Sequence, residues 1–315
     1  MKAVYLTETG SAEVLRFGDV PEPAVGPNDV LIRVRACSLN RLDVFTREGS
    51  HGTRITPPHV LGGDFAGEVV RVGEGVDRYQ SGDHVIASGR GGYAELAVAP
   101  GDRVYPLPQG CTFDQGATLP VAGLTAWQMV MNRAGVRPGE AVFITAAGSG
   151  VSTFAIQLCR TLGARVITTA SSAEKLEKAR ALGAEAGIDY TREDISEKVR
   201  AFTGGEGVDV VLEHVGTPVW NACIEALKPG GRFVTCGVTA GHRVDLHLGR
   251  VFSRALTIMG VGRGTPDDMR AFLKVVEQRK VKGIVHRTFA LAQAAEAHRM
   301  MEASSFFGKL VLNPD

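Results

Sequence analysis

The segment from residue 141 to residue 175, AVFITAAGSGVSTFAIQLCRTLGARVITTASSAEK, constrains the fold more than any other part of the chain. Residues Val142 to Thr145 are apolar or β-branched enough to form a buried parallel strand, which leads into Gly148-Ser149-Gly150. Apolar residues then recur at helical spacing from Val151, and Arg165 to Thr169 supply a second strand. A strand, a glycine turn, a helix and a second strand together form the minimal dinucleotide-binding unit.

The glycine turn predicts that a phosphate binds at the start of the helix. Glycine lets a pyrophosphate approach the backbone N–H groups of a helix N-terminus, whose aligned dipoles stabilise negative charge. The match is incomplete, because Thr153 stands where a strict fingerprint has its third glycine. The alternative is that the glycines only form a tight turn. The length of the surrounding strand–helix–strand unit favours cofactor binding, with Gly148, Ser149, Gly150 and Val151 as contacts.

The end of the second strand indicates which dinucleotide binds. Chains that select NAD usually carry Asp or Glu about 20 residues after the first glycine, to hold the ribose 2′-hydroxyl. Here the segment is Thr169-Ala-Ser-Ser-Ala173, which has no carboxylate to repel a 2′-phosphate. Ser171 and Ser172 can donate hydrogen bonds, and Lys175 is a point charge suited to phosphate. The sequence therefore predicts NADPH, and the alternative makes either serine a helix cap and Lys175 a solvated charge.

Composition sets the size and the broad class of the protein. With 315 residues the chain is long enough for two domains that each bury a sizeable core. Its formal net charge is +1, from 35 Lys and Arg against 34 Asp and Glu, so no excess charge draws it to nucleic acid or to an anionic membrane. No apolar run is long enough to span a bilayer, and MKAVYLTETG is expected to be a short strand and a polar turn rather than a signal peptide. We expect a cytoplasmic protein whose five scattered cysteines stay reduced.

The chain changes character near residue 115. Upstream, short β-rich runs alternate with Gly, Pro and Asp turns, which is typical of a barrel or sandwich. Downstream, helices alternate with strands in the order of a doubly wound parallel sheet. We therefore predict an α/β protein in which residues 1–115 and 262–315 form a β-rich domain and residues 116–261 form a Rossmann domain. The predicted strands are Val30–Val34, Gly67–Val72 and His84–Ala87 in the first part, and Ala164–Thr169, Val208–Glu213, Gly231–Gly237 and Leu256–Val261 in the second.

Several segments, taken in order, resemble a known family. They are MKAVYL, VLIRVRACSLNRLDVFTREG, VLGGDFAGEVVRVGEGV, GDHV, LPVAGLTAWQM, AAGSGVS and FGKLVL, and together they span essentially the whole chain. They are similar to the medium-chain dehydrogenase/reductase superfamily, and most similar to its zinc-independent quinone oxidoreductase branch, which includes zeta-crystallin. The resemblance implies a GroES-like catalytic domain and a Rossmann cofactor domain.

The residues at the zinc-ligand positions of this family differ in the present chain. Asn40 stands where zinc members have a ligand cysteine, and Gly62-Gly63-Asp64 stands where they have a histidine and a glutamate. The third ligand position corresponds to Val121. Catalytic zinc needs three protein ligands and an open coordination position, so the resemblance implies that no metal binds here. Cys37 and His59 lie close to two of these positions in sequence. Because a one-residue shift reverses the direction of a strand side chain, we do not expect either residue to be a zinc ligand.

Without a metal to lower the pKa of an alcohol, the expected reaction is the reduction of an acceptor that is already electrophilic. A quinone or an α,β-unsaturated carbonyl has to be held against the nicotinamide and given a hydrogen bond at its developing oxyanion. The resemblance implies that Asn40 and Asp43 face the cleft, with an amide hydrogen of Asn40 donated to the substrate oxygen. Their alternative role is to stabilise a local turn. His51 is a candidate proton donor where many relatives have a tyrosine, and its alternative is a solvent-exposed loop histidine.

The resemblance implies further cofactor contacts. Tyr190 matches a tyrosine that lies beside the adenosine 2′-phosphate in relatives, and the turn at Gly216 follows the fourth strand of the cofactor domain. Lys309, in FGKLVL, is expected near the cofactor or the cleft, and its alternative is a solvated face of a strand. His214 replaces a residue that is usually small in relatives, and we expect it to be a packing histidine. The contacts expected near the nicotinamide are Gly237, Val238, Gly260 and Gly262.

The sequence also predicts a partner and a reaction. The apolar strand Leu256–Val261 is expected at the edge of its sheet, and pairing of such edges predicts a homodimer. The main hypothesis is an NADPH-dependent reductase of small-molecule quinones or enones. The alternatives are a zinc-type alcohol dehydrogenase and a non-catalytic NADPH-binding protein with a structural, crystallin-like role. Turnover of an acceptor would distinguish the reductase from the non-catalytic NADPH-binding protein. Metal content would distinguish the reductase from the zinc-type alcohol dehydrogenase.

Overall fold

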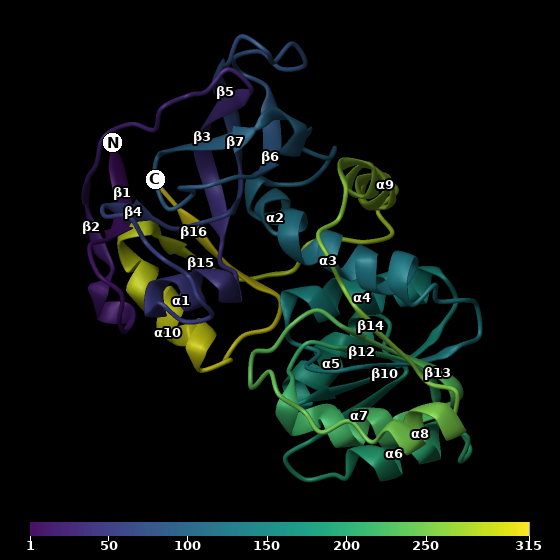
Figure 1. Cartoon of the computed structure of the whole chain (residues 1–315). Helices are drawn as coiled ribbons and strands as arrows, with labels where there is room; N and C mark the ends of the chain where they lie inside the picture. Colours follow the sequence, from purple (N-terminus) through teal and green to yellow (C-terminus); the bar gives the residue numbers. More distant parts are fainter. Residues whose placement is uncertain (315) are drawn as a thin grey trace. The chain divides into compact units, whose positions relative to one another are not determined.

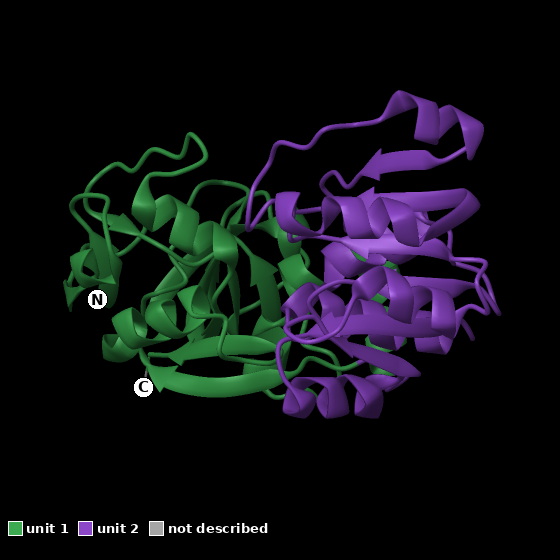
Figure 2. Cartoon of the chain, turned by 90° about the horizontal axis from the view of Figure 1, so that it is seen from below, with its two compact units in different colours: residues 1–122, 269–277, 282–315 green, residues 123–268, 278–281 purple. Residues whose placement is uncertain are grey.

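Two units divide the chain in the computed structural model, which describes residues 1–314. Unit 1 contains Met1–Ala122, Met269–Glu277 and the chain from Lys282 onward, and unit 2 contains Gly123–Asp268 and Gln278–Val281, as Figure 2 shows in two colours. Within the described residues, no helix is both long enough and apolar enough to cross a membrane.

Unit 1 is built around a seven-stranded sheet whose longest strand is β3 (Asp29–Ser38). Most residues of β3 are buried, because the strand pairs antiparallel with β5 (Asp64–Val72), β7 (Leu96–Pro100) and β16 (Lys309–Asn313). The strand order is β15-β16-β3-β5-β6-β8, with β7 also beside β3. The remaining elements are β1 (Lys2–Leu6), β2 (Arg16–Asp19) and β4 (His59–Val60) in a three-stranded sheet, β6 (His84–Ser88), β8 (Val104–Pro106), β15 (Val285–Ala290), α1 (Arg41–Glu48), α2 (Phe113–Ala117), α9 (Pro266–Glu277, in unit 1 from Met269) and α10 (Ala294–Glu302).

Both β3 and β5 are longer than the sequence predicts. β3 continues to Ser38, and β5 begins at Asp64, which lies opposite Ser38 in the antiparallel register. Gly67, the first residue of the predicted strand, lies inside β5 in the structure. A Cβ atom at position 67 would come within 1.9 Å of the Arg33 carbonyl oxygen. The close approach of the two backbones therefore requires glycine, and the longer β5 places Asp64 beside the end of β3.

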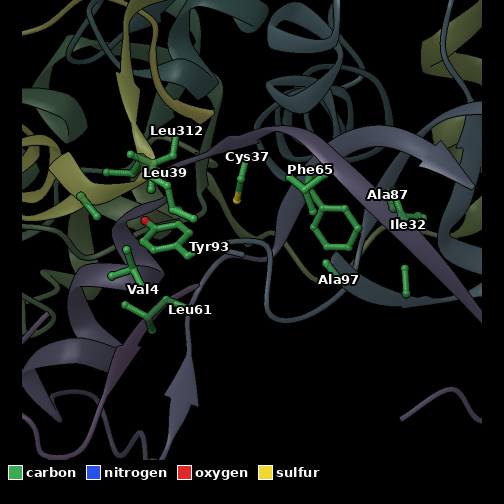
Figure 3. Packing of buried hydrophobic residues seen from close by; sticks show 14 of the residues in the cluster. Val4, Ile32, Cys37, Leu39, Leu61, Phe65, Ala87, Tyr93, Ala97 and Leu312 are labelled. Atoms are coloured by element: carbon green, nitrogen blue, oxygen red, sulfur yellow. The ribbon is translucent and has the colours of Figure 1, made fainter. Parts of the chain in front are cut away.

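Apolar side chains from the sheet of unit 1 form its main core. Figure 3 shows Cys37, Leu39 and Tyr93 in this core, with Phe65 further along the sheet. The Tyr93 side chain is fully buried, so its hydroxyl needs a hydrogen-bond partner inside the protein. Other labelled members of the core are Val4, Ile32, Leu61, Ala87, Ala97 and Leu312.

Unit 2 contains a six-stranded parallel sheet with the order β11-β10-β9-β12-β13-β14. The strands β9 (Ala141–Ile144) and β12 (Val208–Glu213) are almost entirely buried because helices cover both faces of the sheet. Helix α4 (Gly150–Thr161) lies on one face, and α6 (Ile195–Phe202) and α7 (Trp220–Ala226) lie on the other (Figure 1). The chain order reverses between β9 and β12, and ligands of such sheets bind outside the carboxyl ends of the strands at this point. The remaining elements are β10 (Arg165–Ala170), β11 (Ala186–Asp189), β13 (Leu227–Thr235), β14 (Thr257–Gly260), α3 (Leu124–Trp127), α5 (Ala173–Leu182), α6 (Ile195–Phe202), α7 (Trp220–Ala226) and α8 (Leu248–Ser253).

The predicted α/β class is confirmed, because a β-rich unit accompanies a doubly wound parallel sheet whose strand order is the usual one for a Rossmann domain. The first strand of the predicted dinucleotide-binding unit is β9, its helix is α4 and its second strand is β10. The structure therefore brings the carboxyl ends of β9, β10, β12 and β13, which carry most of the predicted cofactor residues, to one edge of unit 2.

Candidate functional site

The turn between β9 and α4 in unit 2 has an unusual backbone. Ala146 has a φ of 49°, a left-handed conformation that is uncommon for a residue other than glycine. Two hydrogen bonds to Thr169 hold the turn, because the Ala146 N–H donates to Thr169 Oγ1 at 3.0 Å and the Ala147 N–H donates to the Thr169 carbonyl at 2.8 Å. Ser149 caps α4, and its Oγ accepts from the Ser152 N–H at 3.0 Å. A capped helix N-terminus thus follows the carboxyl end of β9.

His214, which directly follows β12, is a hydrogen-bond partner of this turn. Its Nε2 lies 2.5 Å from Ser149 Oγ and 3.3 Å from Ser152 Oγ, and its Nδ1 lies 3.2 Å from Thr145 Oγ1. Burial lowers the pKa of His214 to about 4, so the ring is neutral at higher pH. His214, which we expected to be a packing histidine, therefore also orients the predicted cofactor residue Ser149. The position of His214 in the sequence did not indicate this second role.

The residues predicted to select the dinucleotide lie around the carboxyl end of β10. Ser172 caps α5 and accepts from the Lys175 N–H at 3.4 Å, so the helix-cap alternative holds for Ser172. Ser171 is exposed, and burial lowers the pKa of Lys175 in the first turn of α5. The Tyr190 N–H donates to the Ala170 carbonyl at 3.2 Å, and 52% of Tyr190 is exposed. Ser171, Ser172 and Tyr190 are therefore neighbours at this strand end.

The turn after β12 requires glycine at position 216. Gly216 has a φ of 103°, and a Cβ atom there would come within 2.0 Å of the Gly241 carbonyl oxygen. The buried Glu213 side chain holds the turn by accepting from the Gly216 N–H at 2.7 Å and from Thr235 Oγ1 at 3.3 Å. Burial raises the pKa of Glu213, and these hydrogen bonds to its carboxylate oppose that effect.

The other residues predicted near the nicotinamide divide into two groups. Gly237 packs against the end of β12, because a Cβ atom there would come within 2.9 Å of the His214 carbonyl oxygen. Val238, Gly260 and Gly262 are exposed, and a Cβ atom at Gly260 would meet no atom within 4 Å. The structure thus joins Gly237 to the His214 turn, and it leaves the surfaces of the other three residues open.

In unit 1, the carboxamide of Asn40 lies between two ionisable side chains. Lys309 Nζ donates to Asn40 Oδ1 and to the Leu39 carbonyl, both at 2.6 Å. Asn40 Nδ2 donates to Asp64 Oδ2 at 3.0 Å, and the same oxygen accepts from the Val121 N–H at 3.0 Å. Positions 40, 64 and 121, which the resemblance aligns with the zinc site of relatives, therefore meet at one carboxylate oxygen.

Burial dominates the electrostatics of this cluster. Asp64 is 0% exposed and Lys309 is 5% exposed. Burial raises the pKa of Asp64 and lowers the pKa of Lys309, while the attraction between the two charges opposes both shifts. Asp64 Oδ1 is buried and has no hydrogen-bond partner within the described residues. The alternative that placed Lys309 on a solvated strand face is wrong, because its ammonium group lies inside unit 1.

Asp43 stabilises the start of α1 and the loop that precedes β5. Its Oδ2 accepts from the Asn40 N–H at 2.7 Å, and its Oδ1 accepts from the Gly62 N–H at 3.3 Å. Asp43 is buried, and burial raises its pKa to about 6. The local role that was the alternative for Asp43 is therefore present in the structure.

A buried chain of hydrogen bonds leads from Arg47 through His298 to Tyr93. Arg47 Nη1 lies 3.4 Å from His298 Nδ1, and His298 Nε2 lies 3.0 Å from the Tyr93 hydroxyl. Because a guanidinium group can only donate, Nδ1 accepts and the ring proton sits on Nε2, from which it is donated to the Tyr93 oxygen. Burial, and then the nearby Asp43 carboxylate, raise the pKa of the Tyr93 hydroxyl. Arg47 also forms an ion pair with Glu302, so it links α1 to α10.

His51 lies in an exposed turn after α1. It has a φ of 56°, its ring centroid lies 4.0 Å from that of Phe45, and its Nδ1 lies 3.1 Å from Ser50 Oγ. Among the contacts of the described residues, none joins the imidazole to Asn40 or Asp43. The exposed loop position that was the alternative for His51 is therefore the one that the structure shows.

Two site residues, Asp64 and His214, were not assigned a role from the sequence. Asp64 had a signal, because it is a charged residue at the start of an apolar run in which a buried charge needs a partner. His214 had no such signal, because its partners are up to 69 residues away in sequence. Over residues 1–314, no group of three or more His, Cys, Asp or Glu side chains is arranged to hold a metal ion.

Two family models match the chain. Residues 26–109 match the alcohol dehydrogenase GroES-like domain, and residues 150–278 match the zinc-binding dehydrogenase domain. The quinone oxidoreductase of Pseudomonas aeruginosa is 33% identical to the chain over 99% of each protein. The quinone oxidoreductase of Rattus norvegicus is 30% identical over 99% of this chain and 97% of its own length.

Solved structures are similar to the whole chain as well. One that is described as an NAD-dependent alcohol dehydrogenase has a TM-score of 0.95 at 38% identity, with all of both chains covered. A quinone oxidoreductase of Escherichia coli complexed with NADPH has a TM-score of 0.92 at 26% identity, again with all of both chains covered. The similarity therefore extends over both units.

Proposed function

Because the chain belongs to the quinone oxidoreductase branch of the medium-chain dehydrogenase/reductase superfamily, we propose that it is a zinc-independent, NADPH-dependent reductase of quinones or α,β-unsaturated carbonyls. One observation carries the proposal. Asn40, held between Lys309 and Asp64, stands where zinc relatives have a metal ligand. A carboxamide can donate a hydrogen bond to a developing oxyanion, but it does not replace a Lewis acid. This chemistry favours acceptors that are electrophilic before they bind.

Unit 2 has the donors that NADPH requires. The Ser149 cap satisfies the Ser152 N–H, so the N–H groups of Gly150 and Val151 in the first turn of α4 remain for the pyrophosphate. When bound, NADPH supplies the hydride. The E. coli relative complexed with NADPH supports this choice of cofactor. The other residues that we propose to contact it are Gly148, Ser171, Ser172, Lys175 and Tyr190 on the adenosine side, and Gly216, Gly237, Val238, Gly260 and Gly262 on the nicotinamide side.

Unit 1 has the groups that we propose to act on the acceptor. An amide hydrogen of Asn40 binds the oxygen on which negative charge develops, and Asp43 fixes the backbone of Asn40. Reduction of an enone or quinone consumes one hydride and one proton. We propose that the exposed imidazole of His51 passes this proton to the oxygen and takes another from solvent.

An acceptor panel with chelator-treated protein tests this function. The panel contains quinones, enones and simple alcohols or ketones, each assayed with NADPH and with NADH while zinc content is measured. We expect turnover of quinones or enones with NADPH and no gain of activity on adding zinc. Alcohol oxidation that requires zinc and NAD⁺ would instead favour a zinc-type alcohol dehydrogenase. The similar solved structure that is described as an NAD-dependent alcohol dehydrogenase suggests this alternative. Tight NADPH binding without any turnover would favour the structural, crystallin-like role.

We also propose that two copies of the chain form a homodimer through β14. This strand is the outermost of the six-stranded sheet, and Ile258 on it is 37% exposed. An exposed apolar edge strand offers unpaired N–H and C=O groups to a second copy. Light scattering at micromolar concentration should give twice the chain mass, and Ile258→Lys should lower it toward the mass of one chain. A wild-type chain that scatters as a monomer would contradict this arrangement.

A further inference from the structure

The orientation of the Asn40 carboxamide is set by opposite charges on its two sides. An ammonium group only donates hydrogen bonds, and Lys309 Nζ donates to Asn40 Oδ1 at 2.6 Å. A carboxylate only accepts, and Asp64 Oδ2 accepts from Asn40 Nδ2 at 3.0 Å. A reversed amide would turn its NH₂ group toward the ammonium and its carbonyl toward the carboxylate. Both contacts would then be repulsive, so this pair of charges permits one orientation.

This arrangement leaves one donor of Asn40 unused. The NH₂ group has two hydrogens, and Asp64 takes one of them. The second has no acceptor among the described residues. Asn40 is half-buried, whereas Lys309 and Asp64 are buried, so Asn40 is the most accessible of the three residues.

Lys309 is not arranged as a free cation. Two of its three ammonium hydrogens are directed to the Leu39 carbonyl and to Asn40 Oδ1. Its side chain is 5% exposed and lies close enough to Asp64 for the two charges to attract. Asp64 Oδ2 accepts two hydrogen bonds, whereas Asp64 Oδ1 has no hydrogen-bond partner in the described part of the chain. The attraction of Lys309 therefore offsets part of the cost of burying this carboxylate. These contacts favour a structural link to Asn40 over a contact with a dinucleotide phosphate.

We infer that Lys309 is a positioning residue, which together with Asp64 aims the second amide hydrogen of Asn40 at the oxygen of the acceptor. This inference rests on the proposed function, because it assigns the role of Lys309 within the proposed reduction. It replaces the expectation that Lys309 contacts the cofactor. Loss of Lys309 therefore lowers the rate of the chemical step and leaves NADPH affinity unchanged.

Kinetics of Lys309 variants test the inference. Lys309→Met keeps an unbranched side chain that is one atom shorter and lacks the ammonium, and kcat for the best acceptor should fall about 100-fold, as for the loss of one oxyanion donor. The Kd for NADPH, measured by nicotinamide fluorescence, should stay within about twofold, since no phosphate contact is lost. Lys309→Arg can still donate to Asn40, so its kcat should be at least tenfold higher than that of Lys309→Met, which is roughly the contribution of one hydrogen bond. The same change at the exposed Lys274, also in unit 1, is the matched control.

A double-mutant cycle separates positioning from general destabilisation. Asn40→Ala should lower kcat as much as Lys309→Met, and the double variant should lower it little further, because both changes remove one interaction. Lys309→Met combined with Asp64→Asn removes both charges and so keeps unit 1 free of an unpaired buried carboxylate. This variant should fold and still show the low kcat. Independent, multiplicative losses in the cycle, or weaker NADPH binding with kcat unchanged, would overturn the inference.

A readout that does not depend on turnover distinguishes this inference from the proposed function. The side-chain NH₂ resonances of Asn40 in ¹H–¹⁵N spectra are identified by their loss in Asn40→Ala. Lys309→Met should shift them, and Lys274→Met should not. If wild-type protein reduces no acceptor but this shift occurs, the proposed function fails while the positioning contact stands. If the resonances do not move, the positioning role is wrong whatever the protein reduces.

Discussion

Replacing Asp43 with Asn should change how the stability of unit 1 depends on pH. Burial raises the pKa of the Asp43 carboxyl from 3.8 to about 6. Between these values the folded chain holds a proton that the unfolded chain has already released. The stabilisation from this group is therefore complete below the lower value and is lost as the pH rises through the higher one. A shift of about two pKa units corresponds to about 3 kcal/mol, of which about 1.3 kcal/mol is lost between pH 5 and pH 7.

Amide hydrogen exchange on peptides from β3 and β5 measures this effect in the unit that contains Asp43. Wild type should lose about 1.3 kcal/mol more opening free energy than Asp43→Asn between pH 5 and pH 7, or about tenfold in protection factor. Comparing the two proteins at the same pH cancels the intrinsic exchange rates. Both tryptophans, Trp127 and Trp220, lie in unit 2, so their unfolding signal is a control that the substitution should not change. An equal difference between the two proteins at both pH values would refute the reasoning.

Three further predictions concern unit 2. Gly216→Ala should destabilise unit 2 by more than about 2 kcal/mol, because the positive φ at this position disfavours a Cβ atom and because that atom would meet the Gly241 carbonyl. Gly230 also has a positive φ but has open space around it, so Gly230→Ala should cost less free energy of unfolding when both variants are followed by tryptophan fluorescence. Ser149→Ala should cost about 1 kcal/mol through loss of the α4 cap, and a loss below the error of that unfolding assay would contradict the capping role. Ser171→Asp adds a carboxylate at the end of β10 and should lower the ratio of kcat/KM for NADPH to that for NADH at least tenfold, roughly the repulsion of one nearby charge pair; an unchanged ratio would place the 2′-phosphate elsewhere.

The fold of unit 2 could be predicted from sequence because its signals are local. The apolar run before Gly148-Ser149-Gly150 and the helical spacing after it determine β9 and α4 within a few residues. The ends of β3 and β5 could not be predicted in the same way. In the sequence, Gly67 looks like the first residue of a strand. Its place inside β5 depends on close contact with the backbone of Arg33, which belongs to β3.

The candidate site was predictable only in part. Asn40 and Asp43 were identified through the resemblance, but the contacts that define them come from Lys309 near the end of the chain. A separation of 269 residues leaves no local pattern for such a contact. His214 shows the same limit, because its role depends on the turn that follows a neighbouring strand. Sequence identified the residue types in these sites, and the sheet order decided which of them meet.

The most direct test of the proposed hydride transfer uses NADPH that carries deuterium at C4, in separate samples for the two faces of the nicotinamide. Chelator-treated protein is incubated with an enone, and the product is analysed by NMR and mass spectrometry. We predict that deuterium from one face appears at the β-carbon of the product, while the proton on the α-carbon comes from solvent. A product with no deuterium from either face, or transfer that requires added zinc, would contradict a zinc-independent hydride transfer by this chain.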